Sequence, residues 1–296
     1  MRNTAHNSSY PKGGVMCYNK KPDRNMKVKL NDSNLWKDYL TFLGYLSIII
    51  GFAAIFITIP DKDKCLYGLC FFLFLLLAYL IMLLKANLID TLTLDIRGKK
   101  VNIQYGDIFK SKGLKLIPFN EYYDTVVDDK IIAKKSLNGI FIEKHCLNVS
   151  SLDYQISNAL SSKNGNLNQT RIKGKKTFYP IGTTIEVDKE FILAAFTHFD
   201  KNDNAYLNPG EYLFFLDNLW NEINIIYAAR NINIPLIGSG ITRLGGNLTM
   251  QDHLEQILNS IKFSDIKMAQ GSHINIVLHK NVKNEISLFR IKSIYK

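Results

Sequence analysis

The sequence predicts an α/β protein in two parts, a transmembrane helical hairpin followed by a three-layer α/β/α domain with a mixed central sheet. Three observations lead to this prediction. Two long apolar runs stand near the start of the chain, a glycine turn joins two alternating segments soon after them, and helical and strand-like segments then alternate to the end. Such alternation is typical of a sheet with helices packed on its faces.

Residues 1–34 are predicted to form a flexible basic tail, because they are rich in Asn, Lys, Ser and Gly and lack apolar periodicity. This segment carries seven basic and two acidic side chains, so it supplies much of the chain's net charge of +11. Anionic lipid head groups attract a basic segment next to a membrane span. The remaining surplus is diffuse and forms no Arg/aromatic stripe, which argues against a nucleic-acid partner.

Residues 35–86 are predicted to form the hairpin. The uncharged runs 39–59 and 65–84 are each long enough to cross a hydrocarbon core of about 30 Å as a helix. Residues 60–64 leave room only for a tight turn between them. A secretory signal peptide is disfavoured by the long polar lead, and a buried helical hairpin by residues 71–77, which are apolar on all faces.

The distribution of basic residues predicts the orientation of the hairpin. Lysines and arginines precede the first run and follow the second, whereas the turn carries Lys62 and Lys64 beside two aspartates. By the positive-inside rule both termini face the cytoplasm. We therefore expect a multi-pass membrane protein with a cytoplasmic domain.

Residues 91–296 are predicted to form that domain. The alternating segments 91–96 and 100–105 flank Arg97-Gly98-Lys99 and predict a strand hairpin. Further strands are expected at 114–119, at 177–187 with a break at 180–182, at 232–237 and at 274–279, and helices at 151–161, 189–199, 211–231 and 249–261. Residues 163–176 are expected to form a polar loop.

The usual signatures of catalysis and metal binding are absent from the sequence. The four cysteines have no metal-ligand spacing, and the six histidines form no His-Glu-x-x-His pair. Ser, His and Asp residues form no nucleophile elbow. We therefore predict no catalytic residues, no bound metal and no cofactor.

The strongest candidate for ligand binding is the glycine-rich segment that follows the strand at 232–237. A buried strand that ends in closely spaced glycines before a helix leaves backbone N–H groups directed at an anion, which the helix dipole also favours. A nearby arginine adds a charge-assisted contact to a phosphate. The dinucleotide and phosphate-loop fingerprints are incomplete, so an ordinary βα turn stays an equal alternative. The candidate residues are Gly238, Ser239, Gly240, Ile241, Thr242 and Arg243.

A second candidate is the turn Gly106-Asp107-Ile108 at the end of a predicted strand. A carboxylate at this position can accept a hydrogen bond from an exocyclic amine such as that of adenine. On these residues alone, a surface turn is the simpler interpretation.

A calcium loop is a further hypothesis for residues 200–211. Oxygen-bearing side chains stand at positions 1, 3, 5, 9 and 12 of this segment. Position 6 is Ala205, where the sharp turn normally requires glycine, and the sequence contains no partner loop. The pattern therefore argues weakly for calcium.

In their order and context the two turns resemble the macro domain family, which binds ADP-ribose and related nucleotides. The resemblance covers most of residues 91–291 and implies that Asp107 and Ile108 contact adenine, while Ser239, Gly240 and Ile241 form the second phosphate loop. Residues 118–139 replace the family's Asn-Ala-Ala-Asn stretch and triple glycine. This departure implies ligand binding without hydrolysis, with the variable end of the ligand near Asn120 and Asp124.

Two spans followed by a divergent macro domain resemble the membrane effectors of bacterial Thoeris anti-phage systems, with residues 117–124 and 199–207 supporting the match. The resemblance implies location in the bacterial inner membrane and a functional partner, a TIR-domain NAD-consuming enzyme. Its product is expected to be a histidine conjugate of ADP-ribose. Binding is expected to trigger hairpin oligomerisation, membrane disruption and abortive infection.

The small residues of the first span offer a face for close helix packing in lipid, either between copies of the chain or against the second span. They are Gly44, Ser47, Gly51, Ala53 and Ala54. Two other functions stay open at this point, a membrane-anchored ADP-ribosyl hydrolase and a calcium-binding membrane adaptor.

Overall fold

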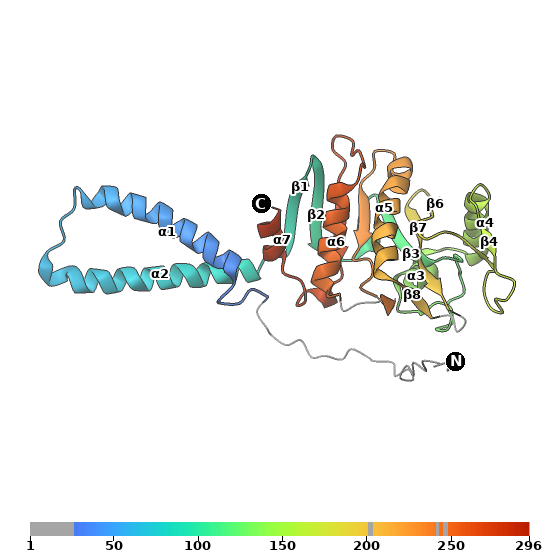
Figure 1. The fold of residues 1–296 in the computed structure, drawn as a ribbon, viewed down its shortest axis with the longest axis horizontal. Coiled ribbons are helices and arrows are strands. Elements are labelled where there is room, and N and C mark those ends of the chain that lie inside the picture. Colours follow the sequence, from blue (N-terminus) through green and yellow to red (C-terminus); the bar gives the residue numbers. More distant parts are fainter. Residues whose placement is uncertain (1–26, 201–203, 241–242, 245–247, 296) are drawn as a thin grey trace, which may run out of the picture.

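The computed structural model describes residues 27–200, 204–240, 243–244 and 248–295. Two long helices, α1 and α2, project from one end of an α/β domain, and the C-terminal helix α7 (Leu288–Ile294) lies where the hairpin meets the domain (Figure 1). The predicted order of hairpin and α/β domain is confirmed.

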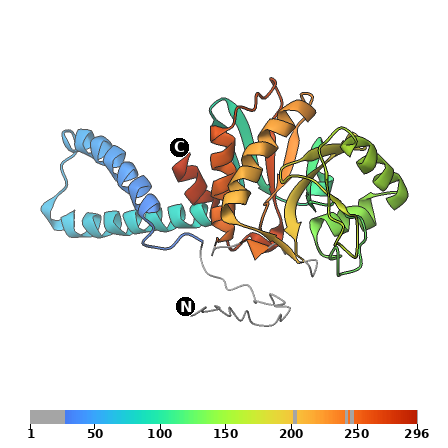
Figure 2. The same ribbon diagram turned by 45° about the vertical axis from the view of Figure 1, so that its right-hand side comes forward.

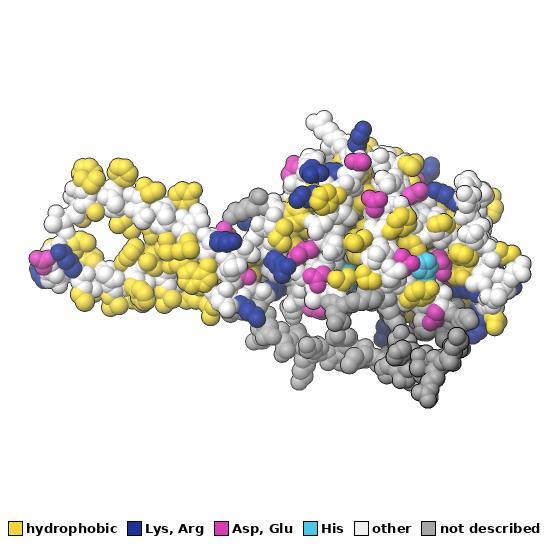
Figure 3. All heavy atoms as spheres, in the orientation of Figure 1, with side chains coloured by type: hydrophobic (Ala, Val, Ile, Leu, Met, Phe, Trp, Pro, Cys, Tyr) yellow, Lys and Arg dark blue, Asp and Glu magenta, His cyan; other side chains and the backbone are white. Residues whose placement is uncertain are grey.

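The hairpin consists of α1 (Ser33–Ala54), a short turn of 3-10 helix (Asp61–Asp63) and α2 (Lys64–Asn87). Asp32 begins α1 by accepting hydrogen bonds from the backbone N–H groups of Asn34 and Leu35. Both helices are long and apolar enough to cross a membrane, and only 6% and 11% of their apolar windows are buried. Apolar side chains cover them, with charges at the tip and at the junction with the domain (Figure 3).

The junction between hairpin and domain is packed and hydrogen-bonded. A small apolar cluster joins the two helices to α7; it contains Val28, Leu35, Tyr39, Tyr79, Leu83, Ala86 and Phe289. The side-chain amide of Asn87 accepts from the Val28 N–H (3.0 Å) and donates to the Val28 carbonyl (3.2 Å). The Tyr79 hydroxyl donates to the Leu30 carbonyl. The chain entering α1 is therefore tied to the end of α2.

The domain is built on a nine-stranded mixed sheet in the order β1-β2-β11-β9-β3-β7-β8-β10, with β6 paired to β7. Its strands are β1 (Thr91–Ile96), β2 (Lys99–Tyr105), β3 (Leu114–Asn120), β6 (Thr184–Val187), β7 (Phe191–Phe199), β8 (Ala205–Leu207), β9 (Ile232–Pro235), β10 (Arg243–Leu244) and β11 (Ile274–Leu278). A separate pair is formed by β4 (Asn166–Leu167) and β5 (Thr177–Phe178). Strands β2, β11, β9, β3 and β7 are parallel, so their carboxyl ends share one edge.

Helices cover both faces of the sheet, as predicted. On one face α5 (Pro209–Ile226) and α6 (Met250–Phe263) lie side by side (Figure 2), and their apolar residues join the larger core cluster. On the other face α3 (Leu137–Ile140), a π-helical turn (Phe141–His145) and α4 (Val149–Leu160) enclose a second cluster. The three-layer α/β/α fold is therefore confirmed.

The prediction of a helix at residues 189–199 is wrong, because this segment forms the central strand β7. Ile192, Ala194 and Phe196 enter the cluster beneath α5 and α6, whereas Phe191 and Leu193 enter the opposite one. A parallel strand buried on both faces has a continuous apolar sequence without alternation, and periodicity does not distinguish it from a buried helix.

The other differences concern boundaries. The expected strand 177–187 is divided between β5 and β6, which belong to different sheets, and β4 lies inside the expected loop 163–176. Helix α5 ends at Ile226, before a turn in which Ala228 and Ala229 have positive φ.

Candidate functional site

The carboxyl edge of the parallel strands brings together the turns that the sequence singles out. Gly106 follows β2 and donates its N–H to the Leu278 carbonyl at the end of β11 (2.9 Å). Gly238 follows β9, and Asn120 ends β3. Since these strands are parallel neighbours in the sheet, segments far apart in sequence open at one edge. Ligands of open α/β sheets bind at this edge.

Hydrogen bonds fix the backbone of the glycine turn after β9. Gly238 has φ of +86°, and the N–H and hydroxyl of Ser239 both donate to the Leu236 carbonyl (3.3 and 2.5 Å). The Tyr212 hydroxyl, from the first turn of α5, donates to the Ile237 carbonyl (3.1 Å). A Cβ at Gly240 would meet no atom of the described residues within 4 Å, so these residues leave open space on this side of the turn.

Three of the predicted phosphate contacts have a limited structural description. Ile241 and Thr242 lie outside the described residues. The backbone of Arg243 pairs with Tyr206 in the parallel β8–β10 contact. Helix α6 begins shortly afterwards with a capping box, in which Thr249 caps the helix and the Asp252 carboxylate accepts from the Thr249 N–H (2.8 Å).

Asp107 caps a turn of 3-10 helix (Ile108–Lys110) by accepting from the Phe109 N–H (3.0 Å). Its side chain is exposed, whereas Ile108 is buried. The turn therefore exposes a carboxylate that can accept a hydrogen bond from an amine.

Asn120 and Asp124 are turned into the protein. Both side chains are buried, and the Asn120 amide donates to the Asp124 carboxylate (3.1 Å). Asp124 also pairs with Arg171 (2.7 Å) and accepts from the Lys175 N–H (2.8 Å). The Arg171 guanidinium stacks over the Tyr122 ring, 3.8 Å from its centroid. These contacts attach the loop before β5 to the end of β3, and the assignment of both residues to a ligand stays a prediction.

A cluster of three charged residues at the same edge was not predicted from the sequence. His198 Nδ1 lies 2.7 Å from Glu121 Oε2, and His198 Nε2 lies 3.4 Å from Glu211 Oε1. The hydrogen bond with Glu121 raises the pKa of His198 above its usual value, against the opposing effect of burial. If residues 189–199 had been predicted as a strand, the side chains of Thr197 and His198 would have been expected on opposite faces of the sheet. The helical interpretation of residues 189–199 hid this signal.

The structure explains the calcium-like pattern in another way. Glu211, at the predicted twelfth position, forms a capping box with Asn208 at the start of α5. The side chain of Asn204, at the fifth position, donates to the Asp200 carboxylate (2.9 Å). Within the described part of the chain, no cluster of three His, Cys, Asp or Glu residues is placed to hold a metal.

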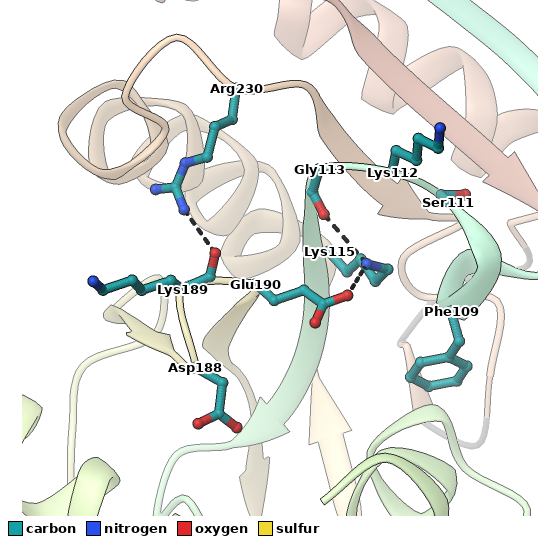
Figure 4. Close-up of a pocket in the computed structure, with 9 residues that line it drawn as sticks. All are labelled: Phe109, Ser111, Lys112, Gly113, Lys115, Asp188, Lys189, Glu190 and Arg230. Carbon is teal, nitrogen blue, oxygen red and sulfur yellow. Dashed lines mark hydrogen bonds and ion pairs between the residues drawn. The ribbon is translucent and has the colours of Figure 1, made fainter.

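A pocket of about 480 Å³ lies at the opposite edge, where β3 and β7 begin (Figure 4). Its central charges are paired, since Lys115 Nζ lies 2.5 Å from Glu190 Oε1. Arg230 contacts Glu186 (2.6 Å) and donates to the Lys189 carbonyl (2.8 Å). Phe109, directly after the Gly106–Ile108 turn, also lines this pocket, and its buried cation, Lys115, already has a partner.

Comparisons with known proteins agree with the fold. The family model "Thoeris protein ThsA, Macro domain" matches residues 101–279. The Thoeris protein ThsA of Bacillus amyloliquefaciens (strain Y2) is 34% identical over 227 residues, which cover 75% of this chain and 76% of that protein. A mutant Oceanobacillus iheyensis macrodomain with ADPR is 14% identical, with TM-score 0.45, covering 69% of this chain and 98% of that one. The same macrodomain with ADP is 13% identical, with TM-score 0.44, covering 69% of this chain and 96% of that one.

Replacement of Asp124 by alanine tests the buried pair. We expect a loss of about 3–5 kcal/mol of unfolding free energy, because Arg171 would keep a buried charge without its carboxylate. Denaturant unfolding of the full chain in detergent measures this loss. Asp90→Ala, which removes the half-exposed ion pair with Lys283, is the control and should cost at most about 1 kcal/mol. Equal losses of unfolding free energy in the two variants would contradict a buried, stabilising Asp124–Arg171 pair.

A pH series tests the His198 cluster. Because the folded pKa is raised above the unfolded value of about 6.5, the pair with Glu121 stabilises the fold fully below that pH. This stabilisation is lost as the pH rises through the folded pKa. The difference in melting temperature between the native protein and His198→Gln should therefore shrink from about pH 6 to pH 8.5. A difference in melting temperature that does not change with pH would contradict a stabilising pair between protonated His198 and Glu121.

Proposed function

The chain belongs to the Thoeris ThsA macro-domain family, and from this premise we propose that it is a membrane effector whose macro domain binds an ADP-ribose derivative. The observation that carries the proposal is the meeting of the Gly106–Ile108 and Gly238–Gly240 turns at one sheet edge. Their strands are separated only by β11, which places the turns about 10 Å apart at normal strand spacing. A nucleotide can bridge that distance.

The ligand's diphosphate would lie against the backbone of the Gly238–Gly240 turn, near the amino end of α6. Its adenine would lie at Asp107 and Ile108. The variable end would then extend toward the ends of β3 and β7, where Glu121 and His198 stand. The carboxylate of Glu211, a side chain 37% exposed beside His198, suits a ligand with a cationic group, such as a histidine conjugate of ADP-ribose made by a TIR-domain enzyme.

Binding without hydrolysis is supported by the end of β3. The buried side chains of Asn120 and Asp124 already bond to each other and to the segment 171–175. A residue that activates water needs a group within hydrogen-bond reach of the substrate. These two residues would have to leave their present partners to act on a ligand.

The hairpin is the proposed output, crossing the inner membrane with both termini in the cytoplasm. A Cβ added at Gly44 or Gly51 would meet no atom of the described residues within 4 Å, so α1 does not pack on α2 at these two positions. Small residues let helices approach closely in lipid. We therefore assign the face to contacts between copies in a homo-oligomer that disrupts the membrane and ends the infection with the death of the cell.

A short path connects the nucleotide site to the hairpin. Tyr105, which immediately precedes the Gly106–Ile108 turn, has the Lys27 ammonium 5.4 Å from its ring centroid. Lys27 Nζ is buried and has no hydrogen-bond partner among the residues that the structure describes, and burial lowers its pKa. Its neighbour Val28 is bonded to Asn87 at the end of α2. A ligand that moves the turn would act on this joint.

Gly240→Glu tests the binding site. The open space at Gly240 accommodates the side chain, but its carboxylate would repel a diphosphate. We expect ADP-ribose and its histidine conjugate to raise the melting temperature of the full chain in detergent, and the variant to bind at least about tenfold more weakly.

Ser162→Glu, which adds the same charge at an exposed turn after α4, is the control and should bind normally. Equal binding by Gly240→Glu would remove the proposed anion site. Release of free ADP-ribose from the conjugate by the native protein would instead favour the hydrolase.

Lys27→Met tests the path to the hairpin. The variant keeps the apolar stem and loses the ammonium over Tyr105. We expect nucleotide affinity to change less than about threefold, while growth arrest on co-expression with the TIR enzyme is lost. Lys29→Met, at an exposed position, is the control and should keep both properties. Full growth arrest by Lys27→Met would contradict the path.

A further inference from the structure

His253, in the first turn of α6, is buried with one ring nitrogen unsatisfied. The residue is 4% exposed, and its Nδ1 has no hydrogen-bond partner within the part of the chain that the structure describes. Buried polar atoms almost always have a partner, because leaving one unpaired is unfavourable. The unpaired Nδ1 of His253 is therefore a candidate contact for a ligand.

The surroundings of His253 lead to the glycine turn. Its ring packs edge-on against Tyr212, with centroids 5.6 Å apart and planes at 90°. The Tyr212 hydroxyl donates to the carbonyl of Ile237, directly before Gly238. Tyr212 and His253 each occupy the fourth position of their helix, α5 and α6, and both helices start at the carboxyl edge of the sheet. One aromatic ring thus separates His253 from the backbone of the turn.

The surroundings of His253 favour its neutral imidazole and leave Nδ1 without a hydrogen-bond partner among the described residues. Burial lowers its pKa, and the nearby Asp252 carboxylate only partly opposes this effect. Asp252 itself is engaged by the Thr249 N–H and hydroxyl (2.8 and 2.7 Å). The facing residue on α5, Tyr212, uses its hydroxyl on Ile237. A neutral imidazole offers one donor and one acceptor, so an anion beside it can be hydrogen-bonded without a protonation cost.

We propose that His253 is a buried contact for the ligand, donating a hydrogen bond from Nδ1 through one ordered water to a phosphoryl oxygen held at the Gly238–Gly240 turn. The inference rests on the proposed function and adds to it a residue that discriminates the occupied site from the empty one. Water bridges of this kind are nearly as favourable as direct hydrogen bonds.

This role has opposite consequences in the two states. Without ligand, His253→Leu removes an unsatisfied polar atom and should raise the melting temperature of the full chain in detergent. With ligand, the same change removes a contact, so the dissociation constant for ADP-ribose measured by titration calorimetry should rise about tenfold. His253→Gln keeps an amide donor and should retain most of the affinity.

Tyr212→Phe is the matched control, because it removes the hydrogen bond to the Ile237 carbonyl and keeps the imidazole of His253. It should lower the melting temperature, in contrast to His253→Leu. A lower melting temperature with unchanged affinity in both His253 variants would show that His253 is only structural and would overturn the inference. Failure of the native protein to bind any ADP-ribose nucleotide would overturn the proposed function and the inference together.

Discussion

The structure depends on five parallel strands that are buried on both faces. Strands β2, β11, β9, β3 and β7 need helices on each side, because their side chains are apolar toward both layers. This constraint sets the positions of α5 and α6, whose amino ends must start at the carboxyl edge. It also brings Asp107, Gly238 and Asn120 to that edge from three distant parts of the chain. The candidate site is thus a consequence of how the core is covered.

The same constraint determines what was predictable from the sequence. The spans, the β1–β2 hairpin and both glycine turns follow from local signals such as uniform apolarity, alternation and glycine spacing. Strand β7 was missed because burial on both faces removes alternation. The Glu121–His198 pair was missed with it, since no local pattern links residues 77 positions apart. Asn120 and Asp124 were chosen by resemblance, and their pairing with Arg171 required the structure.

At the end of β3, buried side chains at this edge are held by one another. Asp124, Arg171 and Tyr122 form a buried stack that binds the segment before β5 to the strand end. A buried ion pair has little surplus stability over apolar packing, but breaking it is costly. The stack therefore makes this end of the site rigid. The proposed ligand contacts lie instead at the turns after β2 and β9, where Asp107 is exposed.

Within the described part of the chain, two buried side-chain atoms lack a hydrogen-bond partner, Lys27 Nζ and His253 Nδ1. Lys27 lies over the Tyr105 ring at the base of the hairpin, and His253 packs against Tyr212, which bonds to the backbone before Gly238. A ligand shifts a conformational equilibrium only through contacts that differ between the two states. A buried group without a partner supplies such a difference, because it gains a hydrogen bond in only one of them. In the proposed function, His253 gains its partner from the ligand, whereas Lys27 links the Tyr105 ring to the base of the hairpin.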